Sequence, residues 1–400
     1  MKTIRIIFIT ISLIALLFGR AKGDEINFLR VDSEQELNAA LEEAKHEHKL
    51  VFVDFTADWC SWCVHMDNTT FKDDEVSEFM NTEFINLKID GTTLFGETKG
   101  TEFGVEAYPT FLILSYTGEI IARESGYKEA HELLEICSNY NTNFNNYRTL
   151  STKYEEDPGD VNLLYKYAQV LYKMDMTEKG RRIAESYFGK IGEVDISDTS
   201  NWNLISLYYL DKEDEYLNQV LDNYLVYEKI IGFEEVSLYF YNAFAHNYTE
   251  ALNRQDEGYL NFSLRLVDGI ASSFLPYGPE EFKNLSRIYF FETAEDWTSY
   301  KTMVVNYMEK YTAGVEETIN FIINFYLHIE ESVALQKANR WAKELVEQEE
   351  NAVHYIVLAC SYYKLGDSVN ISRSLRLAGE LAQSQEEEEL VAEYRTKLGM

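Results

Sequence analysis

The sequence predicts an α/β domain with a central mixed sheet flanked by helices, followed by an all-α region. Three observations lead to this prediction. Residues 50–55 form an almost unbroken apolar run just before the pair Cys60-x-x-Cys63, and such a run is typical of a buried strand. Helix-like and strand-like segments then alternate as far as Asn139. Beyond Asn139 the strand-like alternation disappears, and amphipathic helical patterns take its place.

The elements of the α/β domain are expected in a fixed order. Ser33 and Glu36 have the spacing of a capping box, so a helix is expected to begin there and to reach about Lys49. Strands are expected at 50–55, 84–89, 110–115 and 119–123, and helices from residue 60, at 73–80, within 92–104 and at 128–139.

The Cys60-x-x-Cys63 pair carries the clearest chemical signal in the chain. A helix that begins at Cys60 leaves its first backbone N–H groups unpaired, and these groups and the helix dipole stabilise negative charge there. The pKa of the Cys60 thiol is therefore expected to be lowered. Cys63 follows one turn later, close enough to attack a mixed disulfide formed by Cys60. The pair predicts thiol–disulfide exchange, in which Cys60 attacks and Cys63 resolves.

Metal binding is the main alternative use of such a pair. A structural zinc site needs four ligands, and no second Cys/His pair with suitable spacing occurs in the sequence. Covalent haem attachment requires a histidine directly after the second cysteine, and Val64 occupies that place. Neither a metal nor another cofactor is therefore expected.

Further residues extend the Cys60-x-x-Cys63 motif over residues 35–137. They are Asp54-Phe55, Ala57-Asp58-Trp59, Thr70-Phe71, Asp73, Val76, Leu87-Lys88-Ile89-Asp90, Gly104-Val105, Tyr108-Pro109-Thr110, Gly118-Glu119 and Gly126. In order and spacing, these residues resemble the thioredoxin superfamily. The nearest pattern within it is the C-terminal periplasmic domain of the transmembrane thiol-disulfide interchange reductase, with its secreted Trp-Cys-x-Trp-Cys relatives.

The resemblance implies a proton acceptor behind the cysteines. It assigns Asp54 as the buried acid that takes the proton of Cys63, and burial raises the pKa of a carboxyl group toward neutrality. Members of the superfamily often have a lysine beside this acid on the neighbouring strand. The aligned place in this chain holds Asn86, with Lys88 two residues further on.

The resemblance also implies a substrate groove. Tyr108-Pro109 matches the cis-proline loop of the superfamily, so a cis bond is expected there, with the Tyr108 backbone free to pair with substrate. Trp59 is expected to form a wall of the active site. Trp62 departs from the Pro or His that many members have between the cysteines, and it is expected to expose apolar surface to a partially unfolded substrate.

The region after Asn139 shows weak internal repetition. Residues 318–345 match residues 352–379 under a shift of 34 residues, and a further copy is expected to begin at Val161. These units resemble degenerate tetratricopeptide repeats, pairs of helices that stack into a solenoid. The many Tyr and Phe residues either line a binding surface or fill the core, and aromatic stripes at helical spacing favour the core.

The N-terminus predicts export. Lys2 and Arg5 precede an apolar run at 6–18, and Ala21-Lys22-Gly23 offers a small-x-small cleavage site. Residues 1–23 are therefore expected to form a cleaved signal peptide, although an uncleaved anchor stays an alternative. The formal charge of −32 disfavours binding to nucleic acid. Cys137 and Cys360 lie in helix-like stretches and are expected to be buried apolar residues.

Together these patterns predict three segments: a signal peptide at 1–23, a thioredoxin-like domain at 24–139, and a tetratricopeptide-like helical domain at 140–400. The predicted function is that of a periplasmic or secreted thiol-disulfide oxidoreductase that reduces or isomerises disulfides in client proteins. A membrane thiol reductase is the expected electron donor. The alternative is a helical-repeat interaction or chaperone-like protein in which the thioredoxin-like domain only captures clients.

Overall fold

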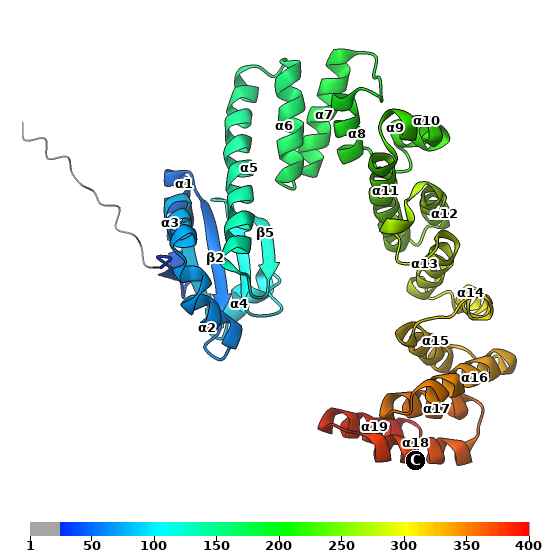
Figure 1. Cartoon of the computed structure of the whole chain (residues 1–400). Coiled ribbons are helices and arrows are strands. Elements are labelled where there is room, and N and C mark those ends of the chain that lie inside the picture. The colour runs from blue at the N-terminus through cyan, green and yellow to red at the C-terminus, as the bar shows by residue number, and fades with distance from the viewer. Residues whose placement is uncertain (1–24, 400) are drawn as a thin grey trace, which may run out of the picture. The chain divides into compact units, whose positions relative to one another are not determined.

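The computed structural model describes residues 25–399 (Figure 1), and the chain divides into two compact units between Val194 and Asp195. The first unit holds a mixed sheet with its helices, and the second consists of helices. This confirms the predicted combination of an α/β domain with a large all-helical part. The predicted signal peptide at 1–23 lies outside the described residues. No helix within residues 25–399 combines the length and the hydropathy that a membrane crossing requires.

The sheet has five strands in the order β1-β3-β2-β4-β5. Strand β2 lies at its centre, parallel to β3 and antiparallel to β4. The strands are β1 (Leu29–Arg30), β2 (Leu50–Thr56), β3 (Phe84–Asp90), β4 (Thr110–Leu114) and β5 (Ile120–Ser125). Because β2 has a neighbouring strand on each side, its backbone is paired along both edges. This central place in the sheet agrees with its almost unbroken apolar sequence.

Helices cover both faces of this sheet. The helices of the first unit are α1 (Glu34–Glu47), α2 (Ser61–Asn68), the 3₁₀ turn η1 (Thr70–Lys72), α3 (Asp74–Glu83), α4 (Leu94–Glu102), α5 (Ala130–Glu156), α6 (Val161–Lys173) and α7 (Thr177–Ile191). Val53 and Phe55 pack with Ala44 of α1 on one face. Phe52 packs with Met80 of α3 and Leu133 of α5 on the other face. Since side chains alternate along a strand, Asp54 lies on the same face as Phe52.

The N-terminus of α1 forms as the capping-box pattern predicts. The Ser33 hydroxyl accepts a hydrogen bond from the Glu36 backbone N–H, and the Glu36 carboxylate accepts one from the Asp32 backbone N–H. The helix ends at Glu47, two residues before the predicted end at Lys49, because His48 adopts a left-handed conformation with φ of 59°.

Helix α5 corrects the prediction of a short helix at 128–139. It runs from Ala130 to Glu156 without a break, and neither glycine nor proline occurs within it to stop it. Phe144, beyond residue 139, is buried in the same core cluster as Phe52 of β2, so the helix keeps packing past its predicted end. The predicted boundary between residues 139 and 140 falls inside α5 and stays a prediction.

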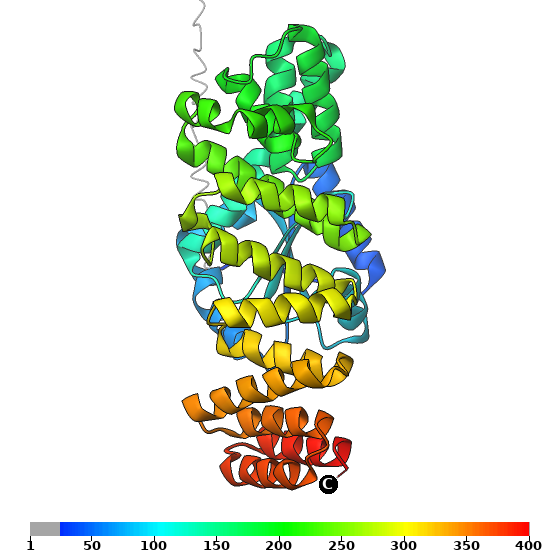
Figure 2. The same cartoon turned by 90° about the vertical axis from the view of Figure 1, so that its right-hand side faces the viewer.

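The second unit is a succession of helices that stack in chain order from α11 onward (Figure 2). They are α8 (Thr199–Tyr208), α9 (Glu215–Asp222), α10 (Tyr224–Ile230), α11 (Phe233–Arg254), α12 (Glu257–Leu266), the 3₁₀ turns η2 (Val267–Gly269) and η3 (Ser272–Phe274), α13 (Pro279–Thr293), α14 (Trp297–Lys310), α15 (Val315–His328), α16 (Ser332–Gln348), α17 (Ala352–Lys364), α18 (Ser368–Leu381) and α19 (Gln385–Lys397). The two segments with internal repetition, 318–345 and 352–379, lie in the pairs α15–α16 and α17–α18. Their assignment to tetratricopeptide repeats stays a prediction.

Most aromatic side chains of these paired helices fill the core, as the helical spacing favours. Phe321, Phe325 and Trp341 belong to one buried cluster together with Leu358 and Leu375. In this cluster each helix of a pair contributes apolar residues, so neither helix buries its apolar face alone.

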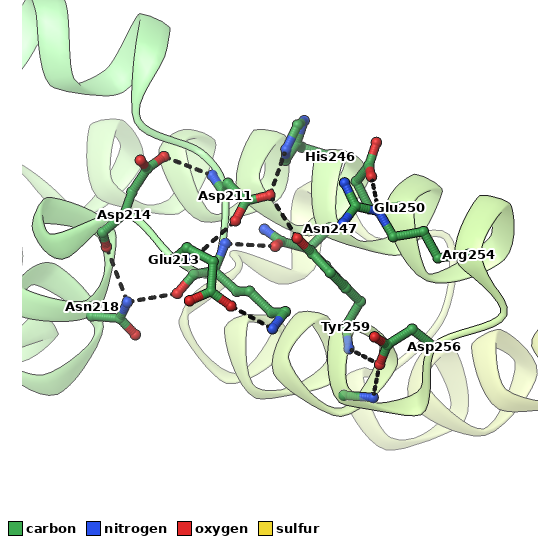
Figure 3. A network of polar contacts seen from close by, with 12 residues as sticks. Asp211, Glu213, Asp214, Asn218, His246, Asn247, Glu250, Arg254, Asp256 and Tyr259 are labelled. Carbon is green, nitrogen blue, oxygen red and sulfur yellow. Dashed lines mark hydrogen bonds and ion pairs between the residues drawn. The ribbon is translucent and has the colours of Figure 1, made fainter.

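A polar network fastens the connection between α8 and α9 to α11 and α12 (Figure 3). The fully buried Asn247 side chain donates hydrogen bonds to the Leu210 and Ala243 carbonyls and accepts one from the Lys212 backbone N–H, at 2.6, 2.7 and 2.8 Å. Asp211 receives the Tyr259 hydroxyl at 3.2 Å. Two backbone groups of the loop, the Leu210 carbonyl and the Lys212 N–H, are thus paired with the Asn247 side chain of α11.

We expect Asn247→Ala to lower the free energy of unfolding of the second unit. The substitution leaves the Lys212 N–H and the Leu210 carbonyl without these partners, and each buried unsatisfied group costs about 1–3 kcal/mol. Chemical denaturation followed by circular dichroism measures the effect. Asn253→Ala, at an exposed position of the same helix, is the matched control and should change stability by less than about 0.5 kcal/mol. Equal effects of the two substitutions would contradict the assignment.

Candidate active site

The two motif cysteines meet at the start of helix α2. Strand β2 ends at Thr56, a short turn follows, and Cys60 is the N-cap residue of α2. Cys60 and Cys63 form a disulfide with a Cα–Cα distance of 5.3 Å. The Cys63 backbone N–H donates to the Cys60 Sγ at 3.1 Å, so this sulfur lies where the first N–H groups of the helix favour negative charge. The structure therefore brings together the pair predicted from its spacing.

Both sulfurs are shielded in this oxidised form. Cys60 is 5% exposed and Cys63 3%, so the two sulfurs differ little in solvent access while the disulfide is closed. The other two cysteines, Cys137 and Cys360, are free and buried, as expected. Burial raises the pKa of each of these two thiols to about 12. They therefore stay protonated and unreactive near neutral pH.

Asp54 lies on β2 behind this helix and is 2% exposed. Its Oδ2 forms an ion pair with the Lys88 Nζ at 3.2 Å, whereas its Oδ1 accepts no hydrogen bond from a described residue. Burial raises the pKa of Asp54 to about 6, and the positive charge of Lys88 offsets only part of this effect. A carboxyl group with this pKa can gain and lose a proton near neutrality.

The register of β2 and β3 corrects the prediction of which residue lies beside Asp54 on the neighbouring strand. The strands pair Asp54 with Lys88 and Phe52 with Asn86, so Lys88, and not Asn86, stands beside the acid. The Asn86 side chain instead donates to the Met80 carbonyl at 3.0 Å. A shift of two residues keeps the same face of a strand, so alternation in the sequence could not separate the two positions.

Lys88 also joins a second carboxylate that the sequence analysis did not single out. Asp67, on α2, forms an ion pair with the Lys88 Nζ, which lies 4.9 Å from the Phe28 ring centroid. A cavity of about 170 Å³, lined by both members of this pair and by Thr56 and Asp58, leaves room for water beside them. Asp54, Lys88 and Asp67 therefore form one coupled group, and its outer carboxylate is partly exposed.

We expect Lys88 and Asp67 to shift the pKa of Asp54 in opposite directions. Lys88→Met removes a positive charge that lowers this pKa, so the pKa should rise above that of the unmodified protein. Asp67→Asn removes a negative charge that raises it, so the pKa should fall. The carboxyl ¹³C shift of Asp54 against pH in the oxidised protein measures both effects. Shifts in the same direction would contradict this arrangement.

The predicted cis-proline loop packs against the cysteines. The Tyr108–Pro109 bond is cis, which confirms the prediction, and the Tyr108 ring packs on the cluster formed by Ala57, Cys60 and Cys63. The Tyr108 hydroxyl donates to the Gly91 carbonyl at 3.1 Å. This hydrogen bond fixes the position of the ring, and the ring holds the loop next to the disulfide.

Two aromatic groups lie next to the motif. Trp59 is 73% exposed and meets the Tyr108 ring edge-on, with the centroids 5.8 Å apart. Trp62 is 57% exposed and contacts Tyr127 and His65, at centroid distances of 5.3 and 6.0 Å. The sequence analysis missed Tyr127, because nothing in the sequence pairs it with a residue of α2. Both tryptophans expose apolar surface beside the cysteines. The role of Trp59 as a wall of the active site and that of Trp62 in substrate contact stay predictions.

Sequence comparisons with known proteins place residues 37–141 in the thioredoxin-like family. A family model described as a thioredoxin-like domain matches residues 37–141. The thioredoxin H-type of Fagopyrum esculentum is 30% identical over 115 residues, which cover 29% of this chain and 93% of that protein. The thiol:disulfide interchange protein DsbD of Yersinia pestis (strain Pestoides F) is 32% identical over 117 residues, which cover 28% of this chain.

The match to the Yersinia protein is partial, because the chain spans only 19% of its length. Among solved structures, the oxidised C-terminal domain of DsbD from Neisseria meningitidis is 28% identical, with coverage of 28% of this chain and 97% of that chain and a TM-score of 0.25. The sequence relatives support thiol–disulfide oxidoreductase chemistry in general at a Cys-x-x-Cys pair of this kind.

Proposed function

Because the chain belongs to the thioredoxin-like family through residues 37–141, we propose that it reduces or isomerises disulfides in client proteins. The observation that supports this most is the closed Cys60–Cys63 disulfide at the N-terminus of α2, in front of the buried Asp54. In the proposed reaction, this disulfide is the state in which the dithiol ends after it has reduced a client. Reduction or isomerisation is favoured over net oxidation by the resemblance to the interchange reductase.

The proposed reaction begins from the reduced pair. The Cys60 thiolate attacks one sulfur of the client disulfide, so a mixed disulfide forms and a client thiolate leaves. Cys63 gives its proton to Asp54, and its thiolate then attacks the Cys60 sulfur. The client departs with two thiolates, which become thiols by taking the proton held by Asp54 and one proton from solvent. The two electrons come from the two cysteines, which end as the Cys60–Cys63 disulfide. A thiol donor must reduce this disulfide again, and we propose a membrane thiol reductase for that step.

The substrate groove is proposed to consist of Trp59, Trp62, Tyr108 and Pro109. The exposed rings of the two tryptophans provide apolar surface for a partially unfolded client, because aromatic side chains bury a large area on contact. The backbone of Tyr108 offers hydrogen-bonding groups to an extended client segment. The small exposure of the sulfurs then limits exchange to segments that reach into this groove.

The location and domain organisation are also part of this proposal. We propose that residues 1–23 direct export to the periplasm or the exterior, a compartment where client disulfides form. The thioredoxin-like domain then comprises residues 24–139, and residues 140–400 form a tetratricopeptide-like repeat domain. The consecutive helix pairs α15–α16 and α17–α18 support the last point.

Trapping of clients tests the proposed function. Cys63→Ala removes the resolving thiol, so mixed disulfides between Cys60 and client cysteines should accumulate and should disappear on treatment with a reductant. Mass spectrometry identifies the trapped proteins. The control is Cys63→Ala combined with Cys60→Ala, which should trap nothing covalently. If the doubly substituted protein retained the same partners without a disulfide, the interaction or chaperone-like function would be favoured instead.

A further inference from the structure

Four exposed aromatic side chains of the second unit come from neighbouring segments: α11, η3 with the residues just after it, and α13. Tyr241 of α11 and Phe274 of η3 have ring centroids 6.1 Å apart. Tyr277 follows Phe274 by three residues, and Tyr289 lies on α13. Their exposed fractions are 38%, 37%, 37% and 39% in sequence order. Because each of these rings keeps more than a third of its area exposed, core packing alone does not explain them.

Carboxylates lie beside two of these rings, those of Tyr277 and Tyr289. The Tyr277 hydroxyl donates to the Glu317 Oε1 at 2.9 Å, which connects the segment before α13 to α15. Glu281 accepts the Tyr307 hydroxyl at 2.9 Å. Partial burial and the negative charges of Glu317 and Glu292 raise the pKa of Tyr289, which agrees with carboxylates close to that ring. We call Tyr241, Phe274, Tyr277, Tyr289, Glu281 and Glu317 the aromatic–acidic surface.

No lysine or arginine neutralises these carboxylates within residues 25–399. Elsewhere in the second unit, three glutamates form ion pairs with lysines of the neighbouring helices, as in Glu309–Lys337, Glu330–Lys364 and Glu331–Lys301. Glu281 and Glu317 form no ion pair among the described residues, and their hydrogen-bond partners are neutral tyrosines. The negative charge of the surface is therefore left for a partner from outside the unit.

We propose that the aromatic–acidic surface binds a polypeptide segment in which lysine or arginine alternates with apolar residues. A cation is attracted to the face of an aromatic ring and to an unpaired carboxylate, and the apolar residues of the segment cover the exposed ring area. The same charge disfavours an anionic lipid surface. It also disfavours a second copy of this chain, whose formal charge is −32.

Fluorescence anisotropy with a cysteine-free peptide tests this proposal in the full chain. The probe is a fluorescein-labelled peptide in which lysine alternates with leucine, and its control has glutamine in place of every lysine. Because neither peptide contains sulfur, the result is independent of the Cys60–Cys63 chemistry. The lysine peptide should bind more tightly, and raising the ionic strength should weaken its binding.

Substitutions locate the binding. Glu281→Gln combined with Glu317→Gln keeps an oxygen acceptor for each tyrosine hydroxyl but removes both charges, so the dissociation constant of the lysine peptide should rise about tenfold. Tyr289→Leu, which keeps apolar area but removes the ring, should also weaken binding. The matched control is Glu386→Gln with Glu388→Gln on α19, which changes the net charge equally at exposed positions and should leave affinity unchanged. Equal binding of both peptides, or an equal loss in the α19 control, would overturn the proposal.

Discussion

Replacing Cys60 with serine is expected to reduce disulfide exchange by more than about a thousandfold, the scale of loss seen when a catalytic nucleophile is removed. A thiolate is the attacking species, and Cys60 is the cysteine at the N-terminus of α2, where the helix dipole favours that form. A serine hydroxyl forms no mixed disulfide. Single-turnover reduction of a peptide disulfide by the pre-reduced protein measures the loss.

Cys360→Ala is the control for this substitution. It also removes one thiol, but that thiol is buried in the second unit, and burial raises its pKa to about 12. Exchange should therefore continue at an unchanged rate. If Cys60→Ser retained activity, or if Cys63 were alkylated before Cys60 in the reduced protein, Cys60 would not be the attacking cysteine.

Replacing Asp54 with asparagine is expected to slow the resolving step by about a hundredfold, at the lower end of the effects of general acid–base groups. The pKa of Asp54 is raised to about 6, so its carboxylate is available as a base above that pH and is protonated below it. The rate of resolution should rise as pH increases through about 6 in the unmodified protein. In the Asp54→Asn variant, the rate of resolution should rise only at a higher pH, near the pKa of an ordinary thiol. An identical pH profile for both proteins would remove Asp54 from the proton transfer.

The same substitution should change how stability depends on pH. The folded-state pKa of Asp54, about 6, lies above the ordinary aspartate pKa of 3.8, so between these values the folded protein keeps a proton that the unfolded chain releases. The unfolding free energy of the unmodified protein should therefore fall as pH rises from about 4 to about 7, by about 3 kcal/mol from this group. Asp54→Asn should lose this component. Hydrogen exchange of the β2 and β3 amides measures it for the sheet alone.

The elements around the cysteines were predictable because their signals are local. The apolar run of β2, the capping box of α1 and the Cys-x-x-Cys spacing each depend on residues within one or two turns of each other, where backbone geometry limits the possible structures. The ends of elements depend on more distant packing. Helix α5 illustrates this, because it extends beyond the predicted end at residue 139 and there buries the side chain of Phe144.

The partners of the candidate site were less accessible from the sequence. Asp54 could be named as a buried acid, but its neighbour depends on the register between β2 and β3, and Asn86 and Lys88 fit the same face equally well. The contacts of Lys88 with Asp67 and of Trp62 with Tyr127 join segments that are distant along the chain. The pattern of apolar and polar residues within one segment does not predict such contacts.

The sequence by itself determined the α/β order of the first region, the helical character of the second and the identity of the reactive pair, because helix capping, apolar periodicity and cysteine spacing are properties of neighbouring residues. Only the tertiary structure decided that Lys88 stands beside Asp54, and that Tyr277 and Tyr289 of the second unit stay exposed beside carboxylates that have no ion-pair partner among the described residues. These features depend on which segments come together when apolar surface is buried. Strand register and helix packing decide this, and both involve residues that are far apart in the sequence.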